Sequence, residues 1–397
     1  MKVLLMSQNG KGLGIAHQLV KEGHTVRAFL RNPDDKSSGL GWLERVDSWR
    51  PVLDDTELVL IDGPGFGSLE KTFRRFGRPF LGGFEIEDLL ANNPWERIST
   101  LIECGLLTPD SWLLLPEEAR ELAWEEPGFR VIADKQYICD KEELYKWVLD
   151  RLDSETEVVI QRLVEGESIT CVGWWNGRAW LDPFSITLSG DPVPGLEVVP
   201  GTITHWVERN SRLVEETQLR LLPFLKERTY RGPISIPCVI NDEGIYATSL
   251  DLGLHFEGIE ALIETMRGSV LDFFFELAVG YAKELDIRGN WGASTALCSA
   301  KAEQEVPILG LNEENLKHIY YKGVFLEEEK TLSSGGSPIL LEVCARGQSI
   351  SQATGRINRT LEYLSSMWYT ASKQWHSKVS VSIDKLRSAG FLGNNNA

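Results

Sequence analysis

Residues 2–24 read KVLLMSQNGKGLGIAHQLVKEGH and change character twice. The first five residues are an apolar run typical of a buried strand, and a glycine-rich turn then leads into apolar residues at helical spacing. A second apolar run, Thr25–Leu30, predicts another strand. Strand, turn, helix and strand form a βαβ unit, so the sequence predicts an α/β fold that begins with a parallel, Rossmann-like sheet.

Two glycine-rich loops are candidate ligand-binding loops. The first follows the opening strand, and the second follows a strand expected at Leu58–Ile61. Because the carboxyl ends of parallel strands meet at one edge of the sheet, we expect both loops to line one cleft there. Glycines let backbone N–H groups approach a phosphate or sugar, although they can also serve only the turn and close strand–helix packing. The expected substrate-binding residues are Asn9, Gly10, Gly12, Gly14, Gly63 and Gly65.

Hairpin signals in the middle of the chain predict antiparallel strands. An Asn-Gly dipeptide separates residues 168–175 from 178–181 and supplies the positive φ angles of a two-residue turn. A second polar turn separates residues 235–240 from 245–252. Between the two hairpins, residues 190–201 are rich in Gly and Pro and predict a loop.

Helical patterns are expected at residues 141–152, 212–227, 270–282 and 350–369. The third is the most apolar, but it is short and carries Asp272, so it is typical of a core helix. We expect no signal peptide and no membrane contact, since no run approaches the roughly 20 apolar residues of a spanning helix.

The composition favours several packed domains and a cytoplasmic location. A chain of 397 residues exceeds one ordinary domain. The net charge of −17 opposes broad nucleic-acid binding, because phosphate neutralisation needs a clustered Lys/Arg surface. The six cysteines are scattered without metal-ligand spacing, as expected of reduced thiols. If the protein is an active enzyme, its expected partner is a small-molecule substrate.

Five segments carry a family resemblance: residues 2–24, 58–82 (LVLIDGPGFGSLEKTFRRFGRPFLG), 156–184 (TEVVIQRLVEGESITCVGWWNGRAWLDPF), 230–266 (YRGPISIPCVINDEGIYATSLDLGLHFEGIEALIETM) and 332–364 (LSSGGSPILLEVCARGQSISQATGRINRTLEYL). Their order resembles phosphoribosylamine–glycine ligase, the ATP-grasp enzyme of purine synthesis, along nearly the whole chain. The resemblance implies an N-terminal βαβ domain at 1–115, an ATP-grasp region at 116–290 and a small C-terminal closing domain at 291–397. It also implies that ATP phosphorylates a carboxylate and that an amine then attacks the acyl phosphate.

The resemblance implies a nucleotide site in the middle of the chain. Lys135 is the candidate nucleotide lysine. Gln161 and Arg162 stand where the family has an acidic pair at the adenine hinge, and Glu167 is the candidate ribose-binding carboxylate. The glycine loop that covers the triphosphate should follow the strand near Val131, but VIADKQYICDKEE contains no glycine. These departures predict weak ATP binding or none.

Asp251 is the candidate magnesium ligand that the resemblance implies. It matches one of two metal-binding positions of the family, and Ser249 stands at the other, so one carboxylate remains. Mg²⁺ prefers oxygen ligands, and Asp242 or Glu257 is the expected source of a second one. Glu260 follows the same hairpin. Acidic residues in hairpins and helix starts are usually only solvated, which is the simpler interpretation.

Three functions are therefore compatible with the sequence. The first is an ATP-dependent ligase of this family, with original or altered chemistry. The second is a catalytically degraded pseudoenzyme or binding scaffold that keeps only the fold. The third is an NAD or nucleotide-sugar oxidoreductase, suggested by the opening βαβ unit and by Asp34 or Asp35 about 20 residues after its turn. The third leaves the second half of the chain unexplained, and the sequence names neither acid nor amine.

Overall fold

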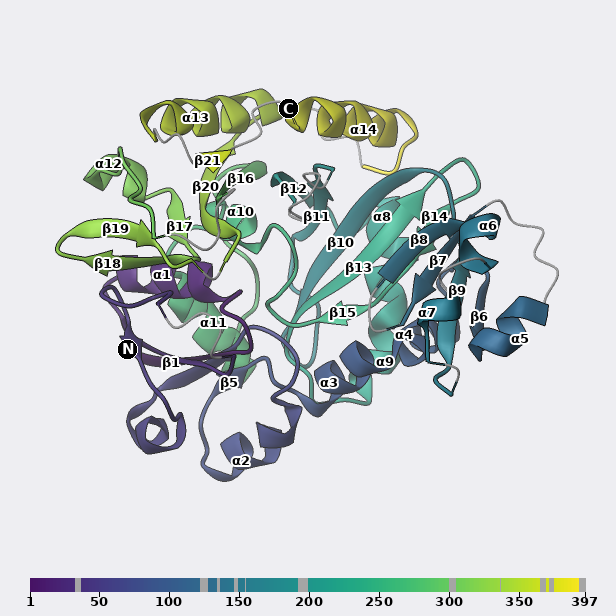
Figure 1. Cartoon of the computed structure of the whole chain (residues 1–397), viewed down its shortest axis with the longest axis horizontal. Coiled ribbons are helices and arrows are strands. Elements are labelled where there is room, and N and C mark those ends of the chain that lie inside the picture. Colours follow the sequence, from purple (N-terminus) through teal and green to yellow (C-terminus); the bar gives the residue numbers. More distant parts are fainter. Residues whose placement is uncertain are drawn as a thin grey trace.

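The computed structural model confirms the mixed α/β architecture (Figure 1). A parallel sheet stands at one end of the molecule, a large antiparallel sheet in the middle, and a smaller antiparallel sheet at the other end (Figure 1). The structure describes residues 1–32, 37–121, 128–133, 136–145, 149–153, 155–191, 199–299, 305–335, 337–364, 369–370 and 375–392.

The parallel sheet is built from the opening βαβ unit and has the order β3-β2-β1-β4-β5. Its strands are β1 (Lys2–Ser7), β2 (Thr25–Leu30), β3 (Glu44–Arg45), β4 (Leu58–Ile61) and β5 (Phe80–Leu81). Side chains of β1 alternate between two cores: Leu4 and Met6 pack into one, and Val3 and Leu5 into the other. Burial on both faces explains the uninterrupted apolar runs of β1 and β4.

The central sheet has ten strands, eight of them in the order β14-β13-β10-β11-β12-β16-β20-β17, with β15 and β21 pairing at its sides. The strands are β10 (Glu167–Trp175), β11 (Phe184–Ser189), β12 (Gly201–Val207), β13 (Gly232–Ile240), β14 (Ile245–Ala247), β15 (Asp251–Leu252), β16 (Trp291–Ser299), β17 (Ile319–Tyr321), β20 (Ile339–Gly347) and β21 (Tyr369–Thr370). These ten strands come from both sides of the domain boundary expected after residue 290. The domain boundaries given in the sequence analysis remain predictions.

Two smaller units complete the strands. A four-stranded antiparallel sheet has the order β6-β9-β7-β8, and β18 and β19 form a separate hairpin. These strands are β6 (Ser111–Leu114), β7 (Gly128–Ile132), β8 (Gln136–Asp140), β9 (Val158–Arg162), β18 (Val324–Glu327) and β19 (Lys330–Ser333). The four-stranded sheet has its own small core around Phe129, Val131 and Ile160, separate from the two larger cores.

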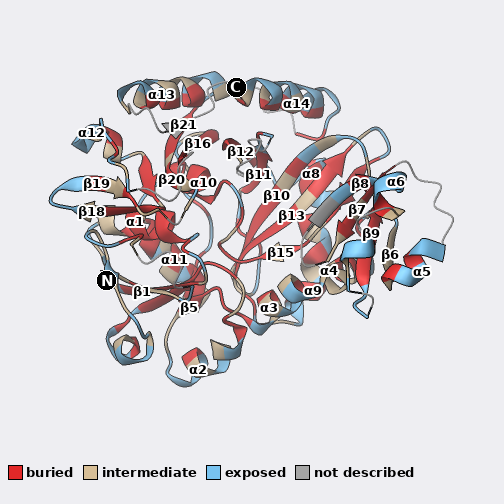
Figure 2. Cartoon of the chain, viewed as in Figure 1, coloured by how far each residue is buried: buried red, intermediate tan, exposed pale blue. Residues whose placement is uncertain are grey.

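The helices pack around these sheets, and Figure 2 shows buried residues on the sides that face them. The helices are α1 (Leu13–Lys21), α2 (Glu70–Arg75), α3 (Glu85–Asn92), α4 (Pro94–Glu103), α5 (Pro116–Glu121), α6 (Lys141–Glu143), α7 (Leu149–Arg151), α8 (Arg212–Glu216), α9 (Leu222–Lys226), α10 (Ile259–Glu264), α11 (Val270–Val279), α12 (Glu313–Leu316), α13 (Ile350–Tyr363) and α14 (His376–Ser388). Within the described ranges, no helix combines the length and apolarity needed to cross a membrane.

The first hairpin differs from the sequence-based prediction. Residues 178–181 form no strand; after the Asn-Gly turn they make a single bridge, between Trp175 and Trp180. The next strand along the chain that pairs with β10 is β11, which begins at Phe184, three residues after the predicted strand ends. The position of the turn was predicted correctly, but of the two turn residues only Gly177 has a positive φ angle, and the Asn176 side chain accepts hydrogen bonds from two backbone N–H groups beyond it.

The helix predicted at 212–227 is broken. It consists of α8, a 3₁₀ turn at Gln218–Leu221, and α9, because Thr217 leaves the helical conformation and Pro223 starts α9. The predicted helix at 350–369 ends earlier, at Tyr363, and residues 369–370 form β21. Strand β12 was not predicted, and all seven of its residues are buried.

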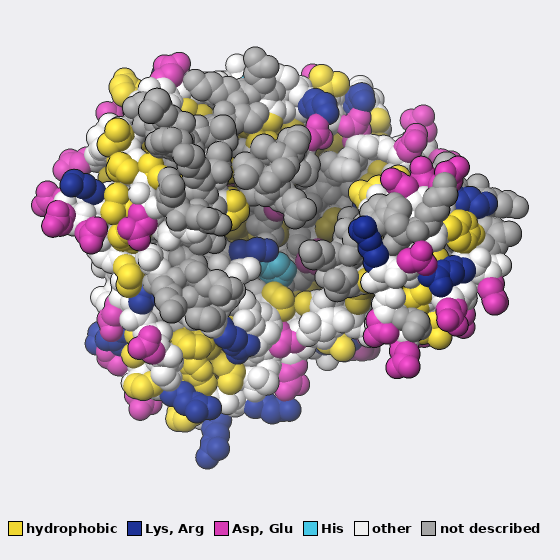
Figure 3. Space-filling model, in the orientation of Figure 1, with side chains coloured by type: hydrophobic (Ala, Val, Ile, Leu, Met, Phe, Trp, Pro, Cys, Tyr) yellow, Lys and Arg dark blue, Asp and Glu magenta, His cyan; other side chains and the backbone are white. Residues whose placement is uncertain are grey.

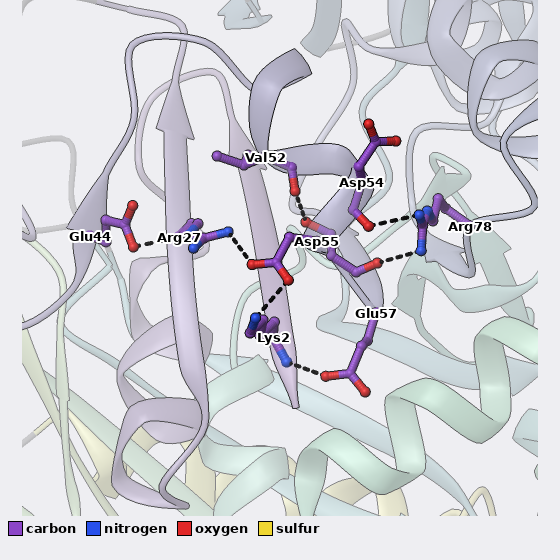
Figure 4. Close-up of polar contacts among 9 residues, drawn as sticks. Lys2, Arg27, Glu44, Val52, Asp54, Asp55, Glu57 and Arg78 are labelled. Atoms are coloured by element: carbon purple, nitrogen blue, oxygen red, sulfur yellow. Dashed lines mark hydrogen bonds and ion pairs between the residues drawn. The ribbon is translucent and has the colours of Figure 1, made fainter.

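A polar network ties the amino ends of the parallel strands together (Figure 4). Asp55 accepts from Lys2 at 2.6 Å and from Arg27 at 3.2 Å, and Arg27 also donates to Glu44 at 3.0 Å. Lys2 and Arg27 lie on β1 and β2, and Glu44 lies on β3. These contacts are on the edge opposite the glycine loops, so they are structural and leave the carboxyl edge free for a ligand.

Candidate functional site

A cavity of about 480 Å³ lies at the carboxyl edge of the parallel sheet. Its wall combines the β1–α1 loop, the 254–260 segment before and within α10, and residues of β12, β16 and β20. Figure 3 shows this face of the molecule hollowed near its middle, with histidine and Lys/Arg side chains inside the hollow. The polar side chains that line the cavity are Asn9, Lys11, Asn32, Thr202, His255, Glu257, Glu260, Ser294, Lys322, Ser337 and Glu342.

The two predicted loops meet through Asp62, which follows β4. Its Oδ2 accepts from the Gly12 N–H and from the Ser7 hydroxyl, each at 2.5 Å. Burial raises the pKa of Asp62 to about 6, although these two hydrogen bonds act to lower it. Gly12 must be glycine, because a Cβ would lie 2.6 Å from the Asp62 Cβ. The loops are therefore neighbours at one sheet edge, as expected.

The predicted substrate-binding residues divide into two groups. Asn9 and Gly10 line the cavity. The other four are packing positions: Gly12 lies on Asp62, Gly14 on Glu260, Gly63 beside His255, and Gly65 beside Gln8 and Arg31. For these four the contacts favour the interpretation that the glycines serve the turn and close packing.

Three charged side chains line one part of the cavity: Glu260 is buried, and Lys322 and Glu342 are partly buried. Lys322, directly after β17, contacts Glu260 of α10 at 3.0 Å and Glu342 of β20 at 2.7 Å. Burial alone would lower the pKa of Lys322, but the two carboxylates outweigh it and raise that pKa. Burial also raises the pKa of Glu260 to about 7, despite the opposing charge of Lys322. The group of one ammonium and two carboxylates can therefore take up a further proton, on Glu260, near neutral pH.

Sequence reasoning missed Lys322 and Glu342. The available signal was a lysine inside the otherwise apolar run Ile319–Phe325, because a charge in a buried segment needs a partner. The partners could not be found this way, since Glu260 and Glu342 lie on separate elements.

His255 lines the cavity beside Gly63. Burial lowers its pKa; Asp251 acts to raise it and Lys11 to lower it further. Its Nδ1 is buried and, within the described residues, has no hydrogen-bond partner. This unpartnered atom lies close to Gly253.

The predicted nucleotide residues lie apart from the cavity. Gln161 is buried and donates to the Ser111 hydroxyl at 3.2 Å. Arg162 pairs with Asp110 at 3.3 Å. Lys135 lies outside the described residues.

Glu167 is engaged by the C-terminal helix. It forms an ion pair with Lys385 of α14, whose hydrogen bond is the main reason that the pKa of Glu167 is lowered. Nothing in the sequence pattern indicated that α14 would reach this carboxylate. A nucleotide ribose could bind Glu167 only in competition with Lys385.

The predicted metal ligand is also engaged by a cation. Asp251 contacts Arg97 of α4 at 3.3 Å. Glu257 accepts from the Ser189 hydroxyl at 2.8 Å, and Asp242 is exposed in the β13–β14 turn. In the described parts of the chain, no group of three or more His, Cys, Asp or Glu side chains could hold a metal ion. A magnesium ion at Asp251 would therefore have to compete with Arg97 for the carboxylate.

Comparison with known proteins places the fold. No family model matches the sequence, and no curated protein matches it. Among solved structures, phosphoribosylamine–glycine ligase from Thermotoga maritima has 17% identity and a TM-score of 0.69, over 93% of this chain and 98% of that one. Biotin carboxylase from Campylobacter jejuni has 12% identity and a TM-score of 0.64, over 99% and 96%. L-amino acid ligase from Bacillus licheniformis has 14% identity and a TM-score of 0.61, over 92% and 98%.

These matches define the class by fold: the chain has the architecture of the ATP-grasp ligases. Within that class, the expected resemblance to phosphoribosylamine–glycine ligase is confirmed over nearly the whole length of both chains. At these identities the likeness concerns the fold, so activity must be argued from the residues.

Proposed function

We propose that the chain is a divergent ATP-dependent carboxylate–amine ligase whose central cavity binds the small-molecule substrate. The observation that carries the proposal is the charged group in the cavity wall, in which the buried Glu260 and the partly buried Glu342 both contact Lys322. Buried charges are costly to a fold and are commonly kept at functional sites. The ATP-grasp architecture over the full chain supports the same class of reaction.

The cavity residues suit a polar substrate with both charges. Lys11 and Lys322 offer ammonium groups to a carboxylate, and Glu257 offers a carboxylate to an amine. Leu254, Phe256 and other apolar residues of the wall exclude water from the bound substrate. The residues thus bind and orient an acid or amine; ATP, when bound, would supply the phosphoryl group that activates the acid.

The metal and nucleotide positions limit this proposal. Because Asp251 is paired with Arg97, we derive no step through a metal ion. The Arg97–Asp251 ion pair specifically favours a second candidate function, a binding scaffold that keeps the fold and the cavity but has lost catalysis. The oxidoreductase alternative stays a prediction, and Asp34 and Asp35, on which it partly rests, lie outside the described residues.

Formation of ADP tests the proposal. The purified full chain is incubated with ATP, Mg²⁺ and combinations of small carboxylic acids and amines, beginning with glycine. A ligase forms ADP only when both substrates are present. Lys11→Ala should reduce this rate, because the exposed Lys11 lines the cavity, whereas Lys283→Ala, at an exposed position elsewhere, should not. Absence of ADP above background with every pair would contradict the ligase and leave the scaffold.

A further inference from the structure

A second large cavity, of about 560 Å³, lies among β20, α10, α12 and α13. Figure 1 shows α12, α13 and β17 gathered at one end of the molecule. None of the residues that line this cavity lines the central one. The two are separated by α10, which presents Glu260 to the central cavity and Glu264, one turn later, to the second.

Arginines dominate this second cavity. Arg346 at the end of β20 and Arg356 and Arg359 on α13 all line it, together with His318. The acids that face it are Glu264 and Glu314. A smaller adjoining cavity of about 270 Å³ shares Arg346 and Arg356 and adds Arg288. In a chain with a net charge of −17, this concentration of guanidinium groups stands out.

The only buried acid here is already occupied. Glu264 is 4% exposed and accepts from Arg346 at 2.5 Å, from His318 at 2.9 Å and from the Tyr320 hydroxyl at 3.2 Å. Arg346 is therefore held in place by a structural ion pair. Its own backbone carbonyl accepts from Arg356 at 2.6 Å, which directs that side chain to the same cavity.

The arginines of α13 have unused binding capacity. Among the residues that the structure describes, Arg356, Arg359 and Arg288 form no ion pair with a carboxylate. Arg356 and Arg359 are three residues apart, so they project from one face of the helix. Paired guanidinium groups match the oxygens of a phosphate, a dianion that can satisfy both.

We propose that this cavity binds a phosphomonoester, with the phosphate held by Arg356 and Arg359 and oriented by Arg346. The volume exceeds what a phosphate alone needs, and the aromatic ring of Tyr363, 67% exposed, lines the cavity beside the arginines. The organic part of the ligand contacts this ring. The proposal is independent of the proposed ligase activity, because it uses none of the residues of the central cavity.

Binding to the full-length chain tests the proposal, with inorganic phosphate and AMP as probes in isothermal titration. Both probes bind the wild type, and Arg356→Ala/Arg359→Ala weakens both by at least about tenfold, the loss expected for charge-assisted hydrogen bonds. Arg75→Ala, at an exposed arginine of α2, leaves both affinities unchanged. Tyr363→Ser weakens the binding of AMP but not the binding of inorganic phosphate. Adenosine, which lacks the phosphate, binds neither the wild type nor the variants at this cavity.

Three results would overturn the proposal. One is phosphate affinity that is equal in the wild type and in a folded double variant, with melting temperatures matched. Another is no heat of phosphate binding to the wild type at millimolar concentration. The third is a double variant that changes only the oligomeric state in light scattering, which would assign the arginines to contact between copies of the chain.

Discussion

At the scale of single residues, the site is marked by acids that are buried rather than exposed. Glu260 lines the cavity, Asp62 lies behind the β1–α1 loop, and Glu87 of α3 lies against Gly253. Burial raises the pKa of Glu87 to about 8, although N–H groups of Gly83 and Phe84 act to lower it. These carboxyls share one cause, removal from water, and differ in how many donors compensate for it.

Glu87→Gln should make stability less dependent on pH. The folded-state pKa of Glu87 is raised from 4.5 to about 8, so the stability gained from its proton is fully present below pH 4.5 and is lost as pH rises to about 8. Across that window the wild type should lose roughly 1.4 kcal/mol per pH unit through this residue, and the glutamine variant should not. Urea denaturation at pH 5, 6.5 and 8 measures the difference. Glu85→Gln, at an exposed position of the same helix, is the control and should keep the wild-type slope.

Gly12→Ala should destabilise the fold by about 1–3 kcal/mol, because the added Cβ has no space beside Asp62. Gly355→Ala is the matched control: no atom lies within 4 Å of its added Cβ and it is inside α13, so it should stabilise by about 0.5–1 kcal/mol. Thermal melting of both variants checks the pair. Equal melting temperatures would show that the close contact at Gly12 is not required.

At the scale of elements, α14 has a role that its position at the end of the chain did not suggest. It pairs Lys385 with Glu167 of β10 and Lys378 with Asp191, and Trp375 just before it packs against Gly201 of β12. The helix thus holds the strand that carries Glu167, the candidate ribose-binding carboxylate.

Lys385→Ala should strengthen ATP binding, because it releases Glu167 for a ribose hydroxyl. Lys378→Ala removes a similar exposed ion pair from the same helix without touching Glu167, and should leave the affinity unchanged. Fluorescence titration with a labelled ATP analogue measures both. Equal affinities in the wild type and both variants would argue against a nucleotide at Glu167.

Elements with strong local signals were predicted well. β2 and β4 have the predicted bounds, since uninterrupted apolar runs have few alternatives. β12 was missed because its sequence, GTITHWV, alternates only partly and follows a loop rich in Gly and Pro; it is a strand because β11 and β16 pair with both its edges. At the candidate site, the two loops were predicted correctly from their glycines. Lys322 and Lys385 were not, because their partners are fixed only by the tertiary fold.

At the scale of the whole molecule, the central cavity joins regions that are distant in sequence. The β1–α1 loop, α10, Lys322 and residues of 337–342 all contribute to its wall. Lys322 connects α10 and β20, since it contacts Glu260 on the first and Glu342 on the second.

Lys322→Met should destabilise the molecule by about 3–5 kcal/mol, because it leaves the buried Glu260 and the partly buried Glu342 without a counter-charge. Lys322→Met/Glu260→Gln should recover part of the loss, since one carboxylate is then neutral. Chemical denaturation of both variants and of Glu260→Gln gives the coupling energy. Additive effects would mean that Lys322 and Glu260 do not interact.

The order of strands in the central sheet also bears on how the chain is made. β16 pairs with β12, with β20 and with β21, so this sheet draws on residues from Glu167 to Thr370. The parallel sheet, by contrast, needs only the first 81 residues. Contacts that span a long stretch of sequence form late, and domains fold as units during synthesis, N-terminal ones first. The parallel sheet can therefore form while the rest of the chain is still being synthesised, whereas the central sheet cannot be completed until β20 and β21 have been made.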